Sequence, residues 1–219
     1  MTPFCVVATA GTTVAGAFDP LVDVADLCAM YGVWMHVDCC WGGAALLSRR
    51  YHCLLDGIER ADSVAWNPHK MMSTTQQCAA FLTCHIGLLE RAHSSCAEYL
   101  FQRDKFYDVS YDTGDKSVQC ARKADAFKVW LMWKQRGAAG FEAVVDGAVH
   151  LAQYLTSQLS RRDGFRLVYA EPEFTNVCFW YVPPSLRGQV ETPDWWKKLG
   201  NVSLTVCLFR IIIIYPLDS

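Results

Sequence analysis

The sequence predicts an α/β protein built around a parallel β-sheet. Three observations support this: a short apolar and β-branched run at residues 4–9, a helical spacing of apolar residues after Asp19-Pro20, and another apolar run at residues 33–37. A strand, a helix and a strand in this order form a right-handed crossover, which places both strands parallel in one sheet. A chain of 219 residues with 52% hydrophobic residues can bury such a core.

The first helix has recognisable ends. Asp19 is expected at its N-cap and Pro20 in its first turn, and Gly32 is expected to end it. The strand at residues 33–37 closes on Asp38 and leads into a Gly-rich turn with a short helical stretch. Later strands are expected at residues 62–66, 77–83, 165–169 and 176–182, and helices at residues 87–99, 122–136 and 140–160.

A domain boundary is expected where the composition changes, at Gly137 to Gly140. Residues 1–136 are expected to form part of a large sheet domain. Residues 137–219 are expected to hold connecting helices and the start of a small domain, with an aberrant tail after about residue 201. The polar and aromatic segment 101–116 is expected to be a long surface loop, and such loops are usually functional or disordered.

Composition excludes several classes of protein. With 20 basic and 22 acidic residues, nothing indicates a nucleic-acid or membrane partner. The eleven cysteines form no CxxC pair, which favours reduced thiols in a cytoplasmic protein over a secreted disulfide scaffold. No GxGxxG or P-loop motif supports nucleotide binding. His36, Asp38 and Cys40 share one strand face, but metal sites usually draw ligands from several elements, so no metal is expected there.

Two charged residues follow predicted strands at the edge where parallel α/β sheets bind their ligands. Asp38 closes one strand, and Lys70 comes just after another, in the run Asn67-Pro68-His69-Lys70. A lysine amine can form a Schiff base with the aldehyde of pyridoxal phosphate (PLP), and a carboxylate can pair with its ring nitrogen. Asp38 could instead cap a turn, and Lys70 could be an ordinary exposed cation.

Several runs resemble the group II PLP-dependent amino-acid decarboxylases. They are His36–Gly43 (HVDCCWGG), Ala61–Lys70 (ADSVAWNPHK) and Asp108–Lys116 (DVSYDTGDK). Tyr99–Tyr107 and Asn176–Arg187 look most like the acidic-substrate branch, which acts on cysteine sulfinate, aspartate or glutamate. The resemblance reaches from residue 1 to about residue 200. It implies the aspartate aminotransferase-like fold of PLP-dependent transferases, with a partial large domain and a truncated small domain.

The resemblance also implies roles for individual residues. Lys70 would form the Schiff base with the PLP cofactor, and Asp38 would pair with the ring nitrogen. His69 would contact the phosphate, and Thr9 would lie near the ring. Cys40 stands where the family usually has an alanine that packs on the ring.

The implied reaction is the decarboxylation of an acidic amino acid. Aspartate or cysteine sulfinate is preferred over glutamate, which gives β-alanine or hypotaurine. Tyr107 would protonate the substrate carbon after carbon dioxide leaves. In the family the loop of this tyrosine reaches toward the partner subunit's site, so a homodimer is implied. Gln77 is a candidate for substrate specificity, or else only a polar residue that enters a strand.

The resemblance also implies that the chain is incomplete at both ends. Members of the family have an upstream histidine that stacks on the ring and a downstream arginine that binds the substrate carboxylate. The tail that contains Ile211–Ile214 looks unlike the family. Two alternatives therefore stay open: a non-catalytic fragment that dimerises with a full-length relative, and another PLP reaction such as transamination, against which Tyr107 argues.

Overall fold

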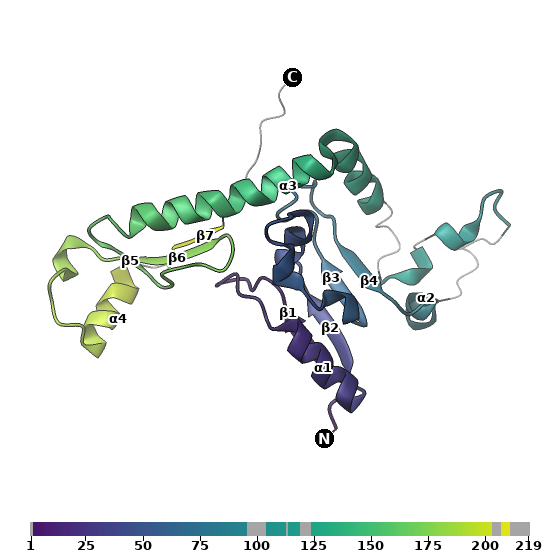
Figure 1. Ribbon diagram of the computed structural model, residues 1–219, viewed down its shortest axis with the longest axis horizontal. Helices are drawn as coiled ribbons and strands as arrows, with labels where there is room; N and C mark the ends of the chain where they lie inside the picture. Colours follow the sequence, from purple (N-terminus) through teal and green to yellow (C-terminus); the bar gives the residue numbers. More distant parts are fainter. Residues whose placement is uncertain (1, 96–103, 113, 119–123, 203–206, 211–219) are drawn as a thin grey trace.

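A computed structural model describes residues 2–95, 104–112, 114–118, 124–202 and 207–210. Two β-sheets lie side by side, and one long helix, α3 (Asp125–Leu159), runs across both of them (Figure 1). The Ile211–Ile214 tail lies outside the described residues. Along the part that is described, no helix is long and apolar enough to cross a membrane.

The larger sheet begins with the predicted crossover unit. β1 (Cys5–Thr9) pairs in parallel with β2 (Trp34–Asp38), and α1 (Leu21–Tyr31) connects them. α1 buries one apolar stripe, made by Leu21, Ala25 and Cys28, against the sheet. The predicted α/β class and its first three elements are therefore confirmed.

The start of α1 differs from the prediction by one residue. Pro20 takes the N-cap position, and no side chain caps the helix. The Asp19 carboxylate instead accepts the backbone N–H of Thr9 at 2.7 Å, so it ties the helix start to the end of β1. Gly32 ends the helix as predicted, because its backbone adopts the left-handed conformation that glycine tolerates best.

The rest of the larger sheet is mixed. β3 (Ser63–Trp66) pairs in parallel with β2, whereas β4 (Ala80–Thr83) pairs antiparallel with β3. The strand order is β1-β2-β3-β4. A loop with turns, and no helix, connects β3 to β4, so the chain reverses instead of crossing over the sheet. β4 is also shorter than the strand predicted at residues 77–83.

The Gly-rich turn after β2 is shaped by close packing. A Cβ atom on Gly42 would lie 2.5 Å from the carbonyl oxygen of Ala10, and one on Gly43 would lie 2.8 Å from the ring of Trp66. Only glycine therefore lets this turn approach the loop that follows β1. Three 3₁₀ helices follow the turn: η1 (Gly42–Leu47), η2 (His52–Leu55) and η3 (Ile58–Arg60).

α3 contains the two helices that were predicted separately, with a break at Gly137 (φ 64°, ψ 179°) between them. Beyond the break, Phe141, Val145 and Val149 pack into the core of the larger sheet. Further along the helix, Ala152 and Leu159 pack into the core of the smaller sheet. The division at residues 136 and 137 stays a prediction, and the second part of α3 contributes to both cores.

The smaller sheet is antiparallel. Its strands are β5 (Phe165–Leu167), β6 (Asn176–Tyr181) and β7 (Cys207–Arg210), with β6 in the middle. Beyond η6 (Pro184–Leu186), α4 (Pro193–Val202) packs Trp195 and Leu199 into a third small cluster. The buried Asn176 joins the two sheets, because its amide donates to the carbonyls of Thr13 at 3.0 Å and Val14 at 3.1 Å.

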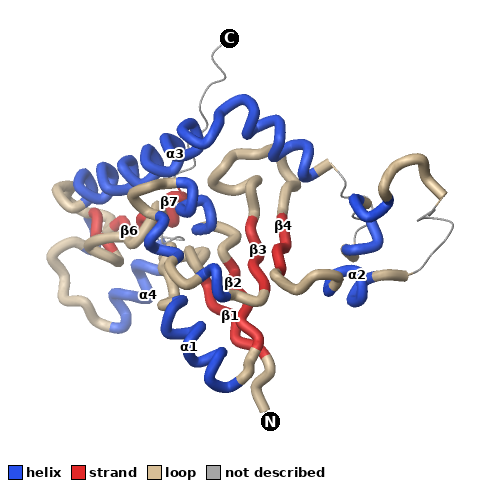
Figure 2. The backbone as a smooth tube through the Cα atoms, turned by 45° about the vertical axis from the view of Figure 1, so that its right-hand side comes forward, coloured by secondary structure: helices blue, strands red, loops and turns tan. Residues whose placement is uncertain are grey.

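A separate part of the chain extends beyond β4 (Figure 2). It holds α2 (Leu88–His93), which is shorter than the predicted helix at residues 87–99, and the 3₁₀ helices η4 (Val109–Tyr111) and η5 (Gly114–Lys116). η5 packs beside α2. Where it is described, the predicted surface loop 101–116 thus consists of irregular chain and these two short 3₁₀ helices.

Candidate active site

The candidate site lies along the carboxyl ends of the parallel strands. The register pairs Thr9 at the end of β1 with Asp38 at the end of β2, and Asp38 in turn with Ala65 in β3. β3 then leads directly into the turn that carries Lys70. Strand order alone therefore brings Thr9, Asp38 and the Lys70 turn to one edge of the sheet.

Asp38 is held as a carboxylate at this edge. Its Oδ1 accepts the backbone N–H of Cys40 at 3.0 Å. Partial burial by itself would raise the pKa of Asp38, but hydrogen bonds from Cys40 and the electrostatic effect of the nearby Lys70 and His36 outweigh it. The net result is a pKa below the ordinary value for aspartate, so the side chain stays ionised at neutral pH.

The two cysteines after Asp38 are held as thiols. The buried Cys39 donates its S–H to the Ala65 carbonyl at 3.2 Å. Burial, together with the negative charge nearby, raises the pKa of Cys39 to about 12. Burial and the hydrogen bond with Asp38 raise the pKa of Cys40 to about 11. Neither cysteine carries appreciable thiolate at neutral pH.

A tight turn presents Lys70. The Lys70 N–H donates to the Asn67 carbonyl at 3.0 Å, and the Ser73 N–H donates to the Lys70 carbonyl at 3.1 Å. Within the described chain, the Lys70 ammonium group has no hydrogen bond or ion pair, although it lies near enough to Asp38 to lower the pKa of that carboxyl. The amine is therefore open to a ligand.

His69 is held from one side by Cys78. Its backbone N–H donates to the Cys78 carbonyl at 3.3 Å, and the Cys78 N–H donates to Nδ1 of the imidazole at 3.1 Å. Nδ1 also contacts the Cys78 carbonyl. These contacts fix the ring just before Lys70, and the predicted phosphate contact of His69 stays a prediction.

Two hydroxyl groups beside this turn were missed in the sequence. Ser73 Oγ and Thr74 Oγ1 are buried and have no hydrogen-bond partner among the described residues. The Thr74 N–H donates to the Pro68 carbonyl at 3.2 Å, which holds the segment against the turn of Lys70. Buried hydroxyls normally find partners, so these two are candidates for ligand contacts. Their only sequence signal is their place just after the lysine.

The structure does not bring Tyr107 to this edge. Its hydroxyl lies 3.3 Å from Asp112 Oδ1, and the Lys105 ammonium lies 5.3 Å from the centre of its ring. The part of the chain that carries Tyr107 lies beyond β4, beside α2 (Figure 2). Lys105 also pairs with Asp112 at 2.7 Å, and these contacts form a local cluster of their own.

Gln77 lies on the surface between the lysine turn and β4. Its side chain is exposed, and its backbone carbonyl accepts a hydrogen bond from Lys128 of α3 at 2.6 Å. A cavity of about 680 Å³ lies nearby, between residues 65–68 and the start of α3. Its walls include Asn67 and Asp125 but neither Asp38 nor Lys70, so the candidate site is the open edge rather than this cavity.

Comparison with known proteins identifies the family. Residues 1–182 match the pyridoxal-dependent decarboxylase conserved domain. The chain is 57% identical over 202 residues to human cysteine sulfinic acid decarboxylase. This alignment covers 92% of this chain and 41% of the human protein. The chain is 56% identical over 205 residues to the acidic amino acid decarboxylase GADL1 of Xenopus tropicalis, covering 93% of this chain and 40% of that protein.

Solved structures agree. Apo mouse CSAD matches with a TM-score of 0.84 at 55% identity, over 93% of this chain and 42% of that one. Catharanthus roseus tryptophan decarboxylase, solved with L-tryptophan, matches with a TM-score of 0.72 at 25% identity, over 90% of this chain and 39% of that one. The aspartate aminotransferase-like fold is thus confirmed, and the chain spans about two fifths of the length of the curated relatives it matches.

Proposed function

The chain belongs to the pyridoxal-dependent decarboxylase family, and from this we propose that it carries the lysine-bearing half of an active site that decarboxylates an acidic amino acid. Aspartate or cysteine sulfinate is the proposed substrate, with β-alanine or hypotaurine as the product. The names of the relatives support the acidic class. The observation that carries the proposal is the ionised Asp38 beside the unpaired amine of Lys70, at one sheet edge.

PLP is the cofactor that the family implies, and the donor groups present fit it. Lys70 offers an amine, and Asp38 offers a carboxylate for a ring nitrogen. Ser73 and Thr74 offer buried hydroxyls that have no hydrogen-bond partner among the described residues. When bound, PLP withdraws electrons from the α-carbon of the substrate, so that the carboxylate on that carbon can leave.

The residues of this chain would divide the work by position. Lys70 would bind the cofactor aldehyde and give way to the substrate amine. Asp38, kept ionised by the hydrogen bonds of Cys40, would hold a proton on the ring nitrogen. Thr9 and Cys40 would lie along the ring, and His69 against the phosphate, where Cys78 already fixes its imidazole.

Tyr107 is proposed as the group that returns a proton to the substrate carbon. Because its loop lies beyond β4 and away from Lys70, we expect it to serve the site of a partner subunit in a homodimer. Gln77, exposed next to the lysine turn, is proposed to contact the substrate side chain. The protein is proposed to act in the cytoplasm, in keeping with the eight cysteines without a disulfide among the described residues.

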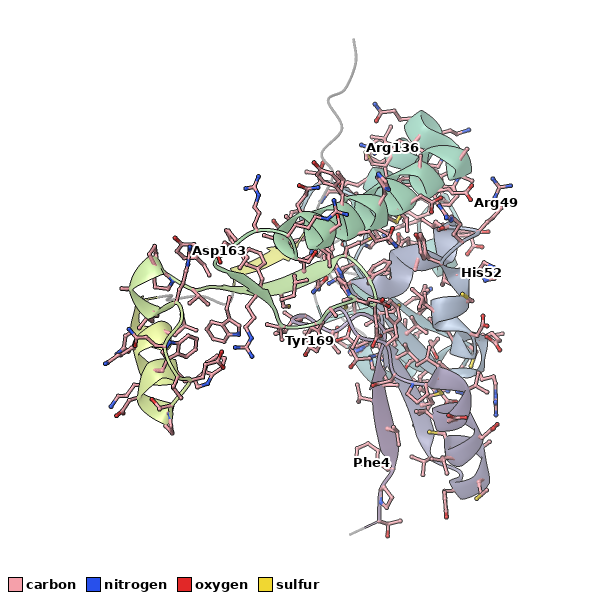
Figure 3. All side chains as sticks on the ribbon, turned by 60° about the vertical axis from the view of Figure 1, so that its left-hand side comes forward. Phe4, Arg49, His52, Arg136, Asp163 and Tyr169 are labelled. Atoms are coloured by element: carbon pink, nitrogen blue, oxygen red, sulfur yellow. The ribbon has the colours of Figure 1, made fainter. Side chains whose placement is uncertain are left out.

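A second candidate function is that of a non-catalytic fragment that dimerises with a full-length relative. The edge strand β1 favours it, because Val7 is 63% exposed and Phe4, just before the strand, is 85% exposed. Figure 3 shows Phe4 at the uncovered start of this strand. An apolar strand edge of this kind is suited to bind further chain.

The deciding experiment is borohydride reduction of the purified chain with added PLP, followed by peptide mapping. Reduction fixes PLP on the lysine that holds it, so the proposal expects a single labelled position at Lys70. Lys70→Arg should remove the label, whereas Lys198→Arg, on the exposed face of α4, should leave it unchanged. Label spread over surface lysines would instead favour the non-catalytic fragment.

A further inference from the structure

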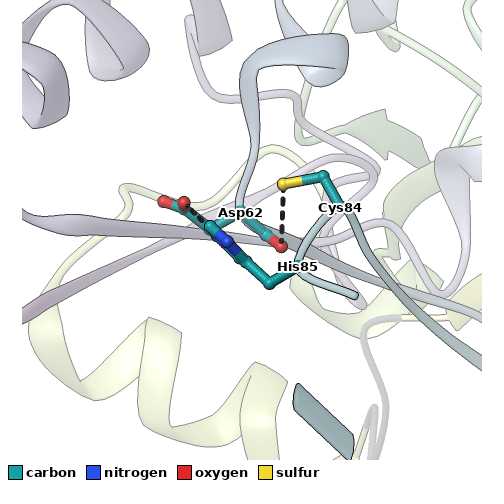
Figure 4. A group of neighbouring side chains, drawn as sticks. All are labelled: Asp62, Cys84 and His85. Carbon is teal, nitrogen blue, oxygen red and sulfur yellow. Dashed lines mark hydrogen bonds and ion pairs between the residues drawn. The ribbon is translucent and has the colours of Figure 1, made fainter. Parts of the chain in front are cut away.

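Three potential metal ligands gather at the other end of β3 from the lysine turn. One ligand atom each from Asp62, Cys84 and His85 can be chosen so that all lie within 4.8 Å of one another. Figure 4 shows the His85 imidazole facing the Asp62 carboxylate and the Cys84 thiol directed at the backbone carbonyl of Asp62, from two neighbouring segments. The full length of β3 separates this group from Lys70, so it is distinct from the candidate active site.

Strand register explains why these residues meet. In the antiparallel pair of β3 and β4, Ser63 lies opposite Thr83. Asp62, just before β3, therefore lies opposite Cys84, just after β4. The Thr83 hydroxyl donates to the Asp62 carbonyl at 2.8 Å, and the Cys84 thiol lies 3.8 Å from the same oxygen. The group is thus fixed by the sheet itself and not by a free loop.

Neighbouring contacts already orient two of the ligands. Asp62 Oδ2 accepts the backbone N–H of Met35 at 2.8 Å, which leaves Oδ1 free to face His85 Nε2 at 2.8 Å. The His85 ring also packs on Trp34, with the ring centres 4.8 Å apart. Outer contacts of this kind hold ligand side chains in place at metal sites.

We propose that Asp62, Cys84 and His85 form a binding site for zinc. Nitrogen, sulfur and oxygen donors together suit Zn²⁺, whereas Mg²⁺ and Ca²⁺ prefer oxygen alone. Zinc bonds of roughly 2.0–2.3 Å would place the ligand atoms roughly 3.3–3.7 Å apart. The ligand atoms that are now up to 4.8 Å apart must therefore approach by about 1 Å, and Asp62 Oδ1 and His85 Nε2, now 2.8 Å apart, must separate by about 0.5 Å. The exposed side chains of Cys84 and His85 have room for it.

Proton balance and the open position fit a three-ligand site. Zinc would replace the hydrogen bond between His85 Nε2 and Asp62 Oδ1, and the Cys84 thiol would release its proton to solvent. Asp62 and His85 also line a cavity of about 390 Å³, together with Cys28 and Arg60. This cavity leaves space for water as the fourth ligand.

The test compares zinc binding by the intact chain and by two double variants, using calorimetry and metal analysis after dialysis. Cys84→Ser with His85→Gln removes two proposed ligands. His52→Gln with Cys53→Ser is the matched control, because it removes the same residue types from an adjacent and exposed pair on η2. Figure 3 shows His52 on the outer surface, remote from the small sheet.

The proposal expects the Cys84/His85 variant to lose one equivalent of tightly bound zinc, or to bind it more than about 10-fold more weakly. The His52/Cys53 variant should bind like the intact chain. Cobalt added to the intact chain should show a thiolate charge-transfer band that Cys84→Ser alone abolishes. Equal zinc stoichiometry and affinity in both double variants, or a cobalt spectrum without this band, would overturn the site and leave only an ion pair.

Discussion

At the scale of single residues, the environment of Cys39 and Cys40 sets their chemistry. Both thiols adjoin the ionised Asp38, and both have a raised pKa, about 12 for Cys39 and about 11 for Cys40. A free thiol next to an aldehyde cofactor could add to it, but only a thiolate does so quickly. The site can therefore hold cysteines where the family usually has alanine.

Alkylation rates test this protection. At pH 8 we expect Cys40 to react with iodoacetamide about 100-fold more slowly than a thiol of ordinary pKa, since its pKa is raised from 9.0 to about 11. Cys39 should react more slowly still because it is buried. The exposed Cys53 is the internal control, and mass spectrometry of digests after timed quenching gives the rates. Equal rates at Cys40 and Cys53 would contradict the assignment.

The buried thiol of Cys39 also predicts that the stability of the folded chain depends on pH. The pKa of Cys39 is higher in the folded chain than its ordinary value of 9.0, so its contribution to stability is complete below pH 9.0. The contribution is lost as the pH rises toward about 12. Cys39→Ala should therefore lose less stability than the intact chain between these pH values, as measured by urea unfolding. An equal loss of stability with rising pH in the variant and in the intact chain would refute the raised pKa of Cys39.

Asp38 gives a prediction about the cofactor. Its lowered pKa means that the carboxylate stays charged at pH 7 and loses its charge only in acid, below the ordinary aspartate range. Asp38→Asn should weaken PLP binding at pH 7 by about 10-fold or more, because one charge-assisted hydrogen bond is lost. Fluorescence titration with PLP measures this, with the exposed Asp56→Asn as control. An unchanged affinity would exclude the proposed pairing.

At the scale of elements, the sequence predicted where the strands lie better than it predicted their direction in the sheet and the connections between them. The runs that became β1, β2, β3 and β6 were recognisable because strands are rich in apolar and β-branched residues. The antiparallel direction of β4 was not anticipated, since it depends on how the loop after Lys70 folds. Asp19 fits a helix cap by pattern, yet its carboxylate is used by Thr9, a contact that only the tertiary structure creates.

Asn176 of β6 links two elements of the fold, and the strand pattern of β6 did not indicate this link. It is fully buried, and its amide holds the loop after β1 through the carbonyls of Thr13 and Val14. Asn176→Ala should lower the free energy of unfolding by about 0.5–1.5 kcal/mol, because it removes the hydrogen bonds that the buried amide donates to these two carbonyls. Urea unfolding measures the change. Gln189→Ala, which removes an exposed amide bonded to Ser185, should have little effect. Equal losses would contradict the linking role.

At the scale of the whole molecule, the sequence motifs around Lys70 and Asp38 were enough to anticipate the family and the fold. They could not reveal Ser73 and Thr74, because the burial of a hydroxyl depends on the path of the turn. Nor could they reveal the Asp62 cluster, which requires the register of β3 with β4. Contacts between segments that are distant in the sequence could thus not be predicted from local sequence patterns.

The exposed edge of the larger sheet predicts self-association. Among the described strands β1 pairs with β2 alone, and its Val7 is 63% exposed. Val7→Lys should shift the chain toward monomers in sedimentation velocity, because a charge on an edge strand opposes further pairing. Ile86→Lys is the control, since Ile86 is 96% exposed but lies outside the strands. Similar shifts in both variants would indicate nonspecific association instead.

The helix that spans both sheets also determines how the chain opens. Phe141 and Val145 of α3 belong to one core, and Ala152 and Leu159 belong to the other. Exposing either core would break hydrogen bonds in the same helical segment of α3. Backbone amides from residue 141 to residue 159 should therefore exchange with solvent deuterium as one cooperative group, so that an opening of this helix exposes the cores of both sheets together.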